Sequence, residues 1–248
     1  MNQTSSWRAL FQAEWQKIWA QNKYRIYLGL VALLIALGAL LSVIPGNLLK
    51  INMAHYPYAI LSILCYLVIP LGAFMLASDL LSGEVASSEI RFFMIRPVAR
   101  HQILTTKILA IIMYLAVLLF GGLLWSSLLC LLGGGFDTFS LFNALMVYIV
   151  GCIPALTIAA MAVMIATATK SGTASLGLGI LTYLGFMSLG YVLPGIAPLL
   201  LTSYLGIGGM VIGSTIPLAN LVTGIVVLLA YAMIFFSFSA LIFTSRDY

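Results

Sequence analysis

The sequence predicts an all-α protein that crosses a membrane six times. Of the 248 residues, 63% are hydrophobic, and only 17 side chains are charged (11 Lys or Arg plus 6 Asp or Glu). A soluble fold could not bury that much apolar surface, so the bilayer must act as the solvent. We expect a single transmembrane domain over residues 1–248. Its six apolar stretches are close to or longer than the ~20 residues that a bilayer requires: 26–44, 58–78, 106–132, 141–168, 174–193 and 219–243.

The distribution of basic residues predicts how the chain is oriented. Six spans return the chain to the side on which it starts. Ten of the 11 Lys and Arg residues then share one face, and Lys50 alone lies opposite. Since basic residues are enriched in cytoplasmic connections, both termini are predicted to be cytoplasmic. The net charge of +5 is thus a topology signal, and we expect no nucleic-acid partner.

The composition argues against disulfide and metal sites. Three cysteines fall within the apolar stretches, so we expect free buried thiols at Cys65, Cys130 and Cys152. His55 and His101 are far apart in the sequence, and it contains no Cys/His cluster. No metal site is therefore predicted.

No charged side chain lies in the middle of a predicted span. Ion-driven transporters normally keep such a group there, and channels use charged rings or a carbonyl filter. Intramembrane hydrolases need a nucleophile with a base, or paired acids. These classes are disfavoured, and no catalytic residue is predicted. The phosphate-binding motif GxxxxGK[ST] is also missing, so any use of ATP requires a separate ATPase.

Residues 5–23 are predicted to form an amphipathic helix in the membrane interface. Its tryptophan and aliphatic side chains share one helical face, and indole rings prefer that interface. Glu14 falls inside this apolar face, which leaves two interpretations. It forms an exposed pair with Lys17, or it is the partner of a basic group in the charged loop described below.

The segment 194–218 is predicted to be an external re-entrant hairpin between the fifth and sixth spans. Its apolar core is nearly long enough to cross a membrane, but three prolines bracket it and glycines interrupt it at 206, 208, 209 and 213. Irregular backbone is tolerated at membrane depth where it packs on protein. The alternative is a seventh span. Before it, Ser171, Ser175 and Gly179 recur at every fourth position, which suits close helix packing within the chain or with another chain.

The connection 79–105 is predicted to be a cytoplasmic loop that attaches to a partner. Together with Lys107 it holds three of the six acids and four of the 11 basic residues. A serine can cap a helix that begins at Glu89, and Pro97 ends that helix. A helix over 88–96 has only about two turns and is not stable alone in water. Its apolar stripe suits a groove on a partner protein or the lipid surface.

The same connection resembles the signature of a known family. Gly83-Glu84 is followed by Ile90-Arg91, by Arg96-Pro97-Val98-Ala99-Arg100 and by Lys107. In order and spacing these motifs resemble the connection between the second and third spans of type 2 ABC exporter permeases. The chain resembles the six-span permeases of the bacitracin-resistance type in size. Ser88-Glu89 stands where the family usually has Gly-Thr, and Ala99 where it usually has Ser.

The resemblance implies a permease subunit that forms the translocation path of an exporter in a bacterial plasma membrane. It implies a separate ABC ATPase subunit that binds the ATP and Mg²⁺, and a second copy of the permease, so this chain needs no cofactor. The substrate would be hydrophobic or amphiphilic: a peptide antibiotic, a lipid-like molecule or a drug. A non-transporting anchor or sensor subunit and an ATP-independent channel or carrier are the alternatives. The residues expected to contact the ATPase are Glu84, Glu89, Arg91, Phe93, Arg96, Pro97 and Arg100.

Overall fold

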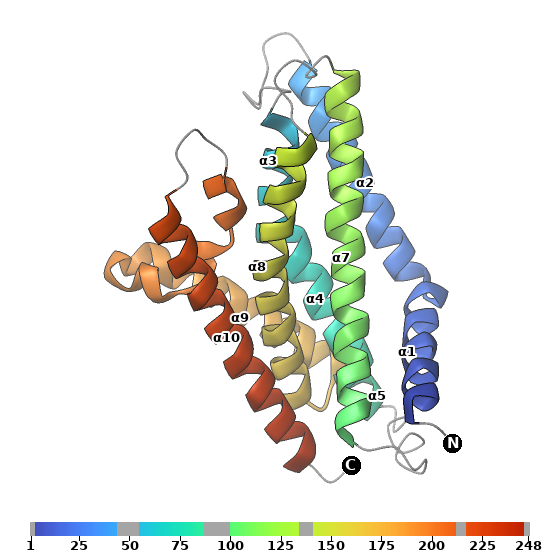
Figure 1. Cartoon of the computed structure of the whole chain (residues 1–248). Coiled ribbons are helices and arrows are strands. Elements are labelled where there is room, and N and C mark those ends of the chain that lie inside the picture. Colours follow the sequence, from blue (N-terminus) through green and yellow to red (C-terminus); the bar gives the residue numbers. More distant parts are fainter. Residues whose placement is uncertain (1–2, 44–54, 87–99, 134–140, 212–216, 246–248) are drawn as a thin grey trace.

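The fold is all-α, as predicted (Figure 1). The computed structural model describes residues 3–43, 55–86, 100–133, 141–211 and 217–245, and no strand occurs in these ranges. Its α-helices are α1 (Gln3–Ala20), α2 (Asn22–Val43), α3 (Tyr56–Ile63), α4 (Ile69–Ala77), α5 (Glu84–Ala86), α7 (Arg100–Leu132), α8 (Leu141–Ala168), α9 (Gly172–Val192) and α10 (Leu218–Ser245).

Six helical segments are long and apolar enough to cross a membrane, which confirms the predicted number. Each overlaps its predicted range, and α1, α5 and the end of α10 lie at one end of the bundle (Figure 1). The third span has 31 residues, or about 46 Å at 1.5 Å per residue. It therefore projects beyond the ~30 Å hydrocarbon core. The six segments are Asn22–Ser42, Tyr56–Ala86, Gln102–Leu132, Leu141–Ala168, Gly172–Val192 and Leu218–Ser245.

Helix α8 is the centre of the bundle. It contacts α4, α7, α9 and α10, and its second half is rich in buried alanines, which let neighbouring helices approach closely. Gly224, Leu228 and Ala232 form the buried stripe of α10. The Thr157 hydroxyl of α8 donates a hydrogen bond to the Leu228 carbonyl at 3.0 Å, which links the two helices.

The second span is interrupted by two π-helical turns. The turn η2 (Leu64–Val68) separates α3 from α4, and η3 (Ser78–Gly83) separates α4 from α5. π-Turns are rare and are frequent at functional sites. Pro70 follows the first one and has no N–H, so the Tyr66 carbonyl lacks the donor that an α-helix would provide. The Tyr183 hydroxyl of α9 fills this place at 2.7 Å.

Elsewhere in the described spans, the helices are also joined by side-chain donors that bond to backbone carbonyls. Tyrosine hydroxyls provide most of these donors, and an indole N–H provides one. Such bonds satisfy the polar groups of buried side chains without a charge inside the membrane. The pairs are Tyr27 to Val68, Tyr56 to Ile35, Tyr114 to Tyr24, Trp125 to Ala32, Tyr148 to Pro57 and Tyr231 to Leu199.

The segment between α9 and α10 forms three short 3-10 helices rather than a seventh long helix. These are η4 (Pro194–Leu199), η5 (Leu201–Tyr204) and η6 (Ile207–Val211). The last two contact α10, and η6 also contacts α8. The segment therefore packs on protein, as irregular backbone at membrane depth requires. Its re-entrant position in the membrane stays a prediction.

The small residues of α9 pack within the chain. Ser175 and Gly179 are buried, and a Cβ added to Gly179 would lie 2.5 Å from a ring carbon of Phe74 in α4. Ser171, the third residue of this series, is exposed. The structure thus favours the intramolecular interpretation of the Ser175–Gly179 pair over contact with another chain.

Helix α1 runs beside the first turns of α7 (Figure 1). Four aromatic rings at every fourth position form a continuous row: the first three are stacked, with centroid distances of 6.2 and 6.4 Å, and the fourth meets the third edge-on at 5.7 Å. Ile18, next to this row, is fully buried. The predicted helix is present, and its location in the membrane interface stays a prediction. The four rings belong to Trp7, Phe11, Trp15 and Trp19.

Candidate functional site

A buried ion cluster joins α1, α5 and α7. We define it as Glu14, Lys17, Glu84 and Lys107. Lys107 is 0% exposed, and its Nζ lies 2.8 Å from Glu14 Oε1 and 2.6 Å from Glu84 Oε2. Lys17 Nζ lies 2.7 Å from the other oxygen of Glu84. Two ammonium groups thus face two carboxylates, which is the pairing that buried charges need.

The second π-turn directs two acids toward the α1–α2 corner. Asp79 and Glu84 are five residues apart, and an α-helix would place them about 140° apart around its axis. In η3 the hydrogen bonds span five residues instead of four, so such residues lie nearly above one another. Asp79 pairs with Lys23 and accepts a hydrogen bond from Tyr24 at the start of α2. The span is therefore held to α1 and to α2, one turn apart.

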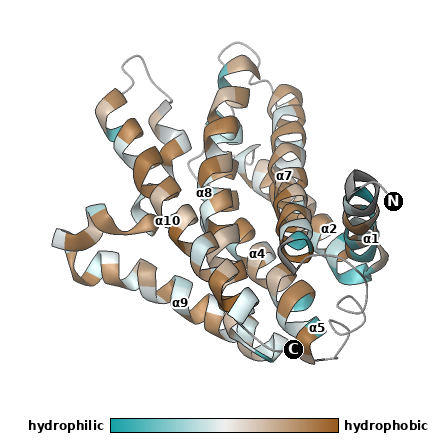
Figure 2. Cartoon of the chain, turned by 60° about the horizontal axis from the view of Figure 1, so that its bottom comes forward, coloured by the Kyte–Doolittle hydropathy of each residue, from teal (hydrophilic) through white to brown (hydrophobic). Residues whose placement is uncertain are grey.

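This corner is where the polar surface of the bundle lies. Figure 2 shows hydrophilic residues on α1, at its junction with α2, and at the start of α7. The helices α4 and α8 are mostly hydrophobic in the same view. The ion cluster therefore lies at one end of the spans and not at their centre.

The ion cluster brackets the predicted coupling loop. Glu84 lies just before residues 87–99, and Lys107 lies in the second turn of α7 after them. Of the seven residues predicted to contact an ATPase, Glu84 is the one whose side chain is described, and it is 2% exposed. Arg100 begins α7. The helix predicted over 88–96 lies outside the described residues, as do Glu89, Arg91, Phe93, Arg96 and Pro97.

The position of Glu14 decides between its two interpretations. Glu14 is 5% exposed and pairs with Lys107, at the end of the charged stretch. The exposed pair with Lys17 is wrong, because Lys17 reaches Glu84 instead. The sequence signal was a glutamate inside an apolar helical face. Lys107 gave a matching signal, since it begins a long apolar run, but its partners could not be identified.

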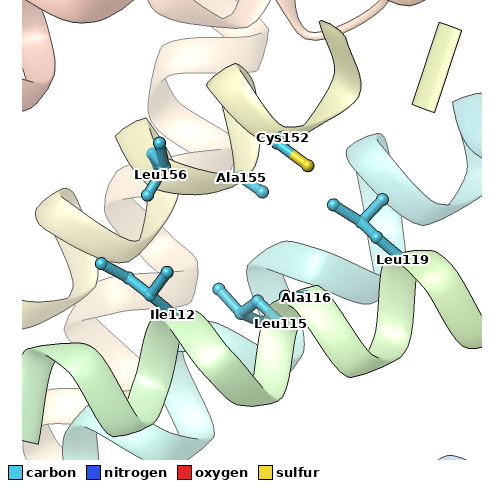
Figure 3. A pocket seen from close by; sticks show the side chains of 7 residues that line it. All are labelled: Ile112, Leu115, Ala116, Leu119, Cys152, Ala155 and Leu156. Carbon is cyan, nitrogen blue, oxygen red and sulfur yellow. The ribbon is translucent and has the colours of Figure 1, made fainter. Parts of the chain in front are cut away.

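Two apolar pockets flank α7 in the described part of the chain. One of about 130 Å³ lies between α7 and α8 (Figure 3). Its seven lining residues are aliphatic apart from Cys152, whose sulfur points into it. The other, of about 250 Å³, lies between α2 and α7 beside Trp125. Among the described residues no group of three His, Cys, Asp or Glu side chains could hold a metal ion.

A match to a protein-family model assigns this chain to a family. No curated protein matches the chain. A family model described as ABC-2 family transporter protein matches residues 10–188, which include the whole ion cluster, the first four spans and most of the fifth, α9. With most of the chain matched and six helices able to cross a membrane, the chain belongs to the ABC-2 family of transporter proteins.

Proposed function

We propose that this chain is the permease subunit of an ATP-driven exporter. It forms the translocation path for a hydrophobic or amphiphilic substrate and is driven by a separate ABC ATPase subunit bound to the loop 79–105. The single observation that carries this proposal is the ion cluster, in which Glu84 and Lys107, from the two helices that flank residues 87–99, are both paired with α1. The family supports a permease role, and the chain has no phosphate-binding motif of its own.

The ion cluster would make the second and third spans move together. Glu84 belongs to the second span and Lys107 to the third. Their atoms lie 2.6 Å apart in a site closed to solvent, where separating two charges costs far more than in water. A displacement of the loop by an ATPase would therefore reach both spans and α1 at once. Rigid-body rocking of the spans is the kind of motion that alternates access.

The interior of the bundle supports a substrate with little charge. The pockets beside α7 are lined by uncharged, mostly apolar residues, and the charged side chains of the described spans lie near one end. Such surfaces bind alkyl chains or ring systems through burial of apolar area. A peptide antibiotic, a lipid-like molecule or a hydrophobic drug fits this description, and a second copy of the chain would complete the path.

Co-purification with an ABC ATPase tests the proposal. A candidate ABC ATPase is co-expressed with the chain, and Arg91→Glu together with Arg96→Glu is compared with the parent protein. We expect the double variant to insert normally and to lose the ATPase, because like charges then face the groove that holds the loop. Lys170→Glu, an exposed basic residue that follows α8, is the control and should retain it.

Reconstituted liposomes separate the proposal from its alternatives. An exporter should hydrolyse ATP faster when a lipophilic substrate is added, and should move that substrate only with ATP. An anchor or sensor subunit would bind the ATPase without moving any substrate. A channel or carrier would give flux without nucleotide. Unimpaired co-purification of the double variant would contradict the assigned loop.

A further inference from the structure

A third pocket differs in chemistry from the two beside α7. It has about 190 Å³ and lies where the π-turn η2, the end of α9 and the 3-10 helix η5 meet. Two tyrosine rings, each with its own phenol O–H, and two aliphatic hydroxyl side chains line it, together with a methionine and a glycine. These are Tyr66, Tyr191, Thr202, Ser203, Met187 and Gly190.

The walls of this pocket are fixed by close contacts. The Tyr66 hydroxyl lies against Gly206, where an added Cβ would be 3.1 Å from its oxygen. The Tyr183 bond to the Tyr66 carbonyl holds α9 against the π-turn. Gly190 leaves the floor open, since an added Cβ there would meet only Leu200, at an ordinary 3.5 Å. These contacts fix the Tyr66 and Gly190 sides of the space, whereas Tyr191, 83% exposed, forms its open side.

The two hydroxyl side chains have already used their hydrogens. Thr202 donates to the Phe186 carbonyl at 3.3 Å, and Ser203 donates to the Ala197 carbonyl at 2.6 Å. A hydroxyl has one hydrogen but two acceptor lone pairs. Both oxygens can therefore still accept hydrogen bonds but cannot donate them. A ligand must bring its own O–H or N–H groups to bond with them.

The surroundings of the pocket define the rest of the ligand. None of its six lining residues is charged. The pocket therefore has no group that would pair with a charged ligand, whether an anion or a cation. Its rim on α9 carries apolar side chains that face outward from the bundle. Val192 is 72% exposed and Leu189 42%, on a helix long and apolar enough to cross the membrane. The turn of α9 that lines the pocket thus carries apolar side chains that can contact alkyl chains.

We propose that this pocket binds the uncharged, hydrogen-bond-donating head of an amphiphile whose alkyl chain stays in the bilayer. A hydroxyl or amide head meets the Thr202 and Ser203 oxygens between the Tyr66 and Tyr191 rings. A transported substrate and a resident lipid share this chemistry. Only the assignment of the amphiphile as cargo rests on the proposed export function, because binding itself needs no ATPase.

Three amphiphiles with one chain and different heads test the pocket. Monoolein has two O–H donors, methyl oleate has acceptors only, and oleate is anionic. The purified chain in nanodiscs is labelled with a photoreactive monoolein, and each compound competes for the labelled site. We expect monoolein to compete at least tenfold better than the other two. Loss of one acceptor, by Thr202→Val or Ser203→Ala, should weaken labelling roughly three- to tenfold.

Gly190 provides a matched pair of variants. Gly190→Phe fills the pocket and should abolish labelling, whereas Gly190→Ala fits at 3.5 Å from Leu200 and should retain it. Thr223→Val removes an exposed hydroxyl of α10 that does not line the pocket and should have no effect. Equal competition by methyl oleate, or equal labelling of the two folded Gly190 variants, would overturn the assignment.

Ligand binding in the pocket and ATP-driven export can fail independently of each other. Monoolein binding without any ATP-driven flux would keep the pocket and overturn the exporter proposal. ATP-driven flux that is unchanged by Gly190→Phe, together with specific labelling, would identify a resident lipid as the occupant. ATP-driven flux lost in Gly190→Phe and kept in Gly190→Ala would identify the occupant as cargo.

Discussion

Removal of the Lys107 charge should destabilise this protein more than any surface ion pair could. In Lys107→Met the ion cluster keeps Glu14, Glu84 and Lys17, so its net charge changes from zero to −1. Glu14 then has no cation, although it is 5% exposed and one of its oxygens already lacks a partner. Breaking a buried pair in this way costs about 3–5 kcal/mol. For a chain of this size that is a fall of roughly 6–20 °C in melting temperature.

The double variant Lys107→Met with Glu14→Leu makes this prediction specific. It restores the zero net charge of the ion cluster, since Lys17 and Glu84 remain paired. We expect it to recover roughly 1–3 kcal/mol of the loss. Melting is followed in detergent by the monodisperse fraction that remains after heating.

Lys23→Met is the matched control for Lys107→Met. Lys23 also pairs with an acid of the second span, but its side chain is 47% exposed. An exposed pair contributes about 1 kcal/mol or less, so melting should fall by only a few degrees. Equal losses in Lys23→Met and Lys107→Met, or a double variant no more stable than Lys107→Met, would refute the role given to the ion cluster.

Three further changes test the packing. Tyr183→Phe leaves the Tyr66 carbonyl without its donor and should cost roughly 1–3 kcal/mol, whereas Tyr231→Phe, at an exposed bond, should cost less; equal melting temperatures would contradict this. Gly179→Ala puts a methyl 2.5 Å from a ring carbon of α4 and should lower the free energy of unfolding by about 1–3 kcal/mol. The control Gly177→Ala meets nothing within 4 Å and should leave stability unchanged. Similar losses of stability in the two variants would refute the close contact. Deleting one residue between Asp79 and Glu84 turns η3 into an ordinary α-turn, in which the two acids are four residues apart and about 40° apart around the axis; both should keep their partners, so the loss should be smaller than in Lys107→Met.

The sequence was sufficient for the number and approximate position of the spans, because apolar length alone decides them. Each observed span, such as Leu141–Ala168, overlaps its predicted range. It also offered the pairing of Glu14 with the charged loop as one of two interpretations. The pairing of Glu14 with Lys107 joins residues 93 positions apart, and a single sequence contains no record of such a contact.

The π-turns of the second span could not be predicted from the sequence. An extra residue in a helical turn leaves no compositional mark, because Leu64–Val68 is as apolar as its neighbours. Only Pro70 suggested an irregularity, and a proline alone predicts a kink without saying which donor replaces the missing one. The hydrogen bond from the Tyr183 hydroxyl to the Tyr66 carbonyl depends on tertiary packing. So does the intramolecular burial of Gly179.

The tyrosine bonds between helices bear on how such a protein diversifies. Their acceptors are main-chain oxygens, such as the carbonyls of Val68, Pro57 and Leu199. Every residue type supplies that oxygen, so replacing the side chain at an acceptor position leaves the acceptor atom in place. The donor tyrosines are constrained, while the positions opposite them are free to change. A family with this architecture can therefore vary the side chains at these acceptor positions on an unchanged frame.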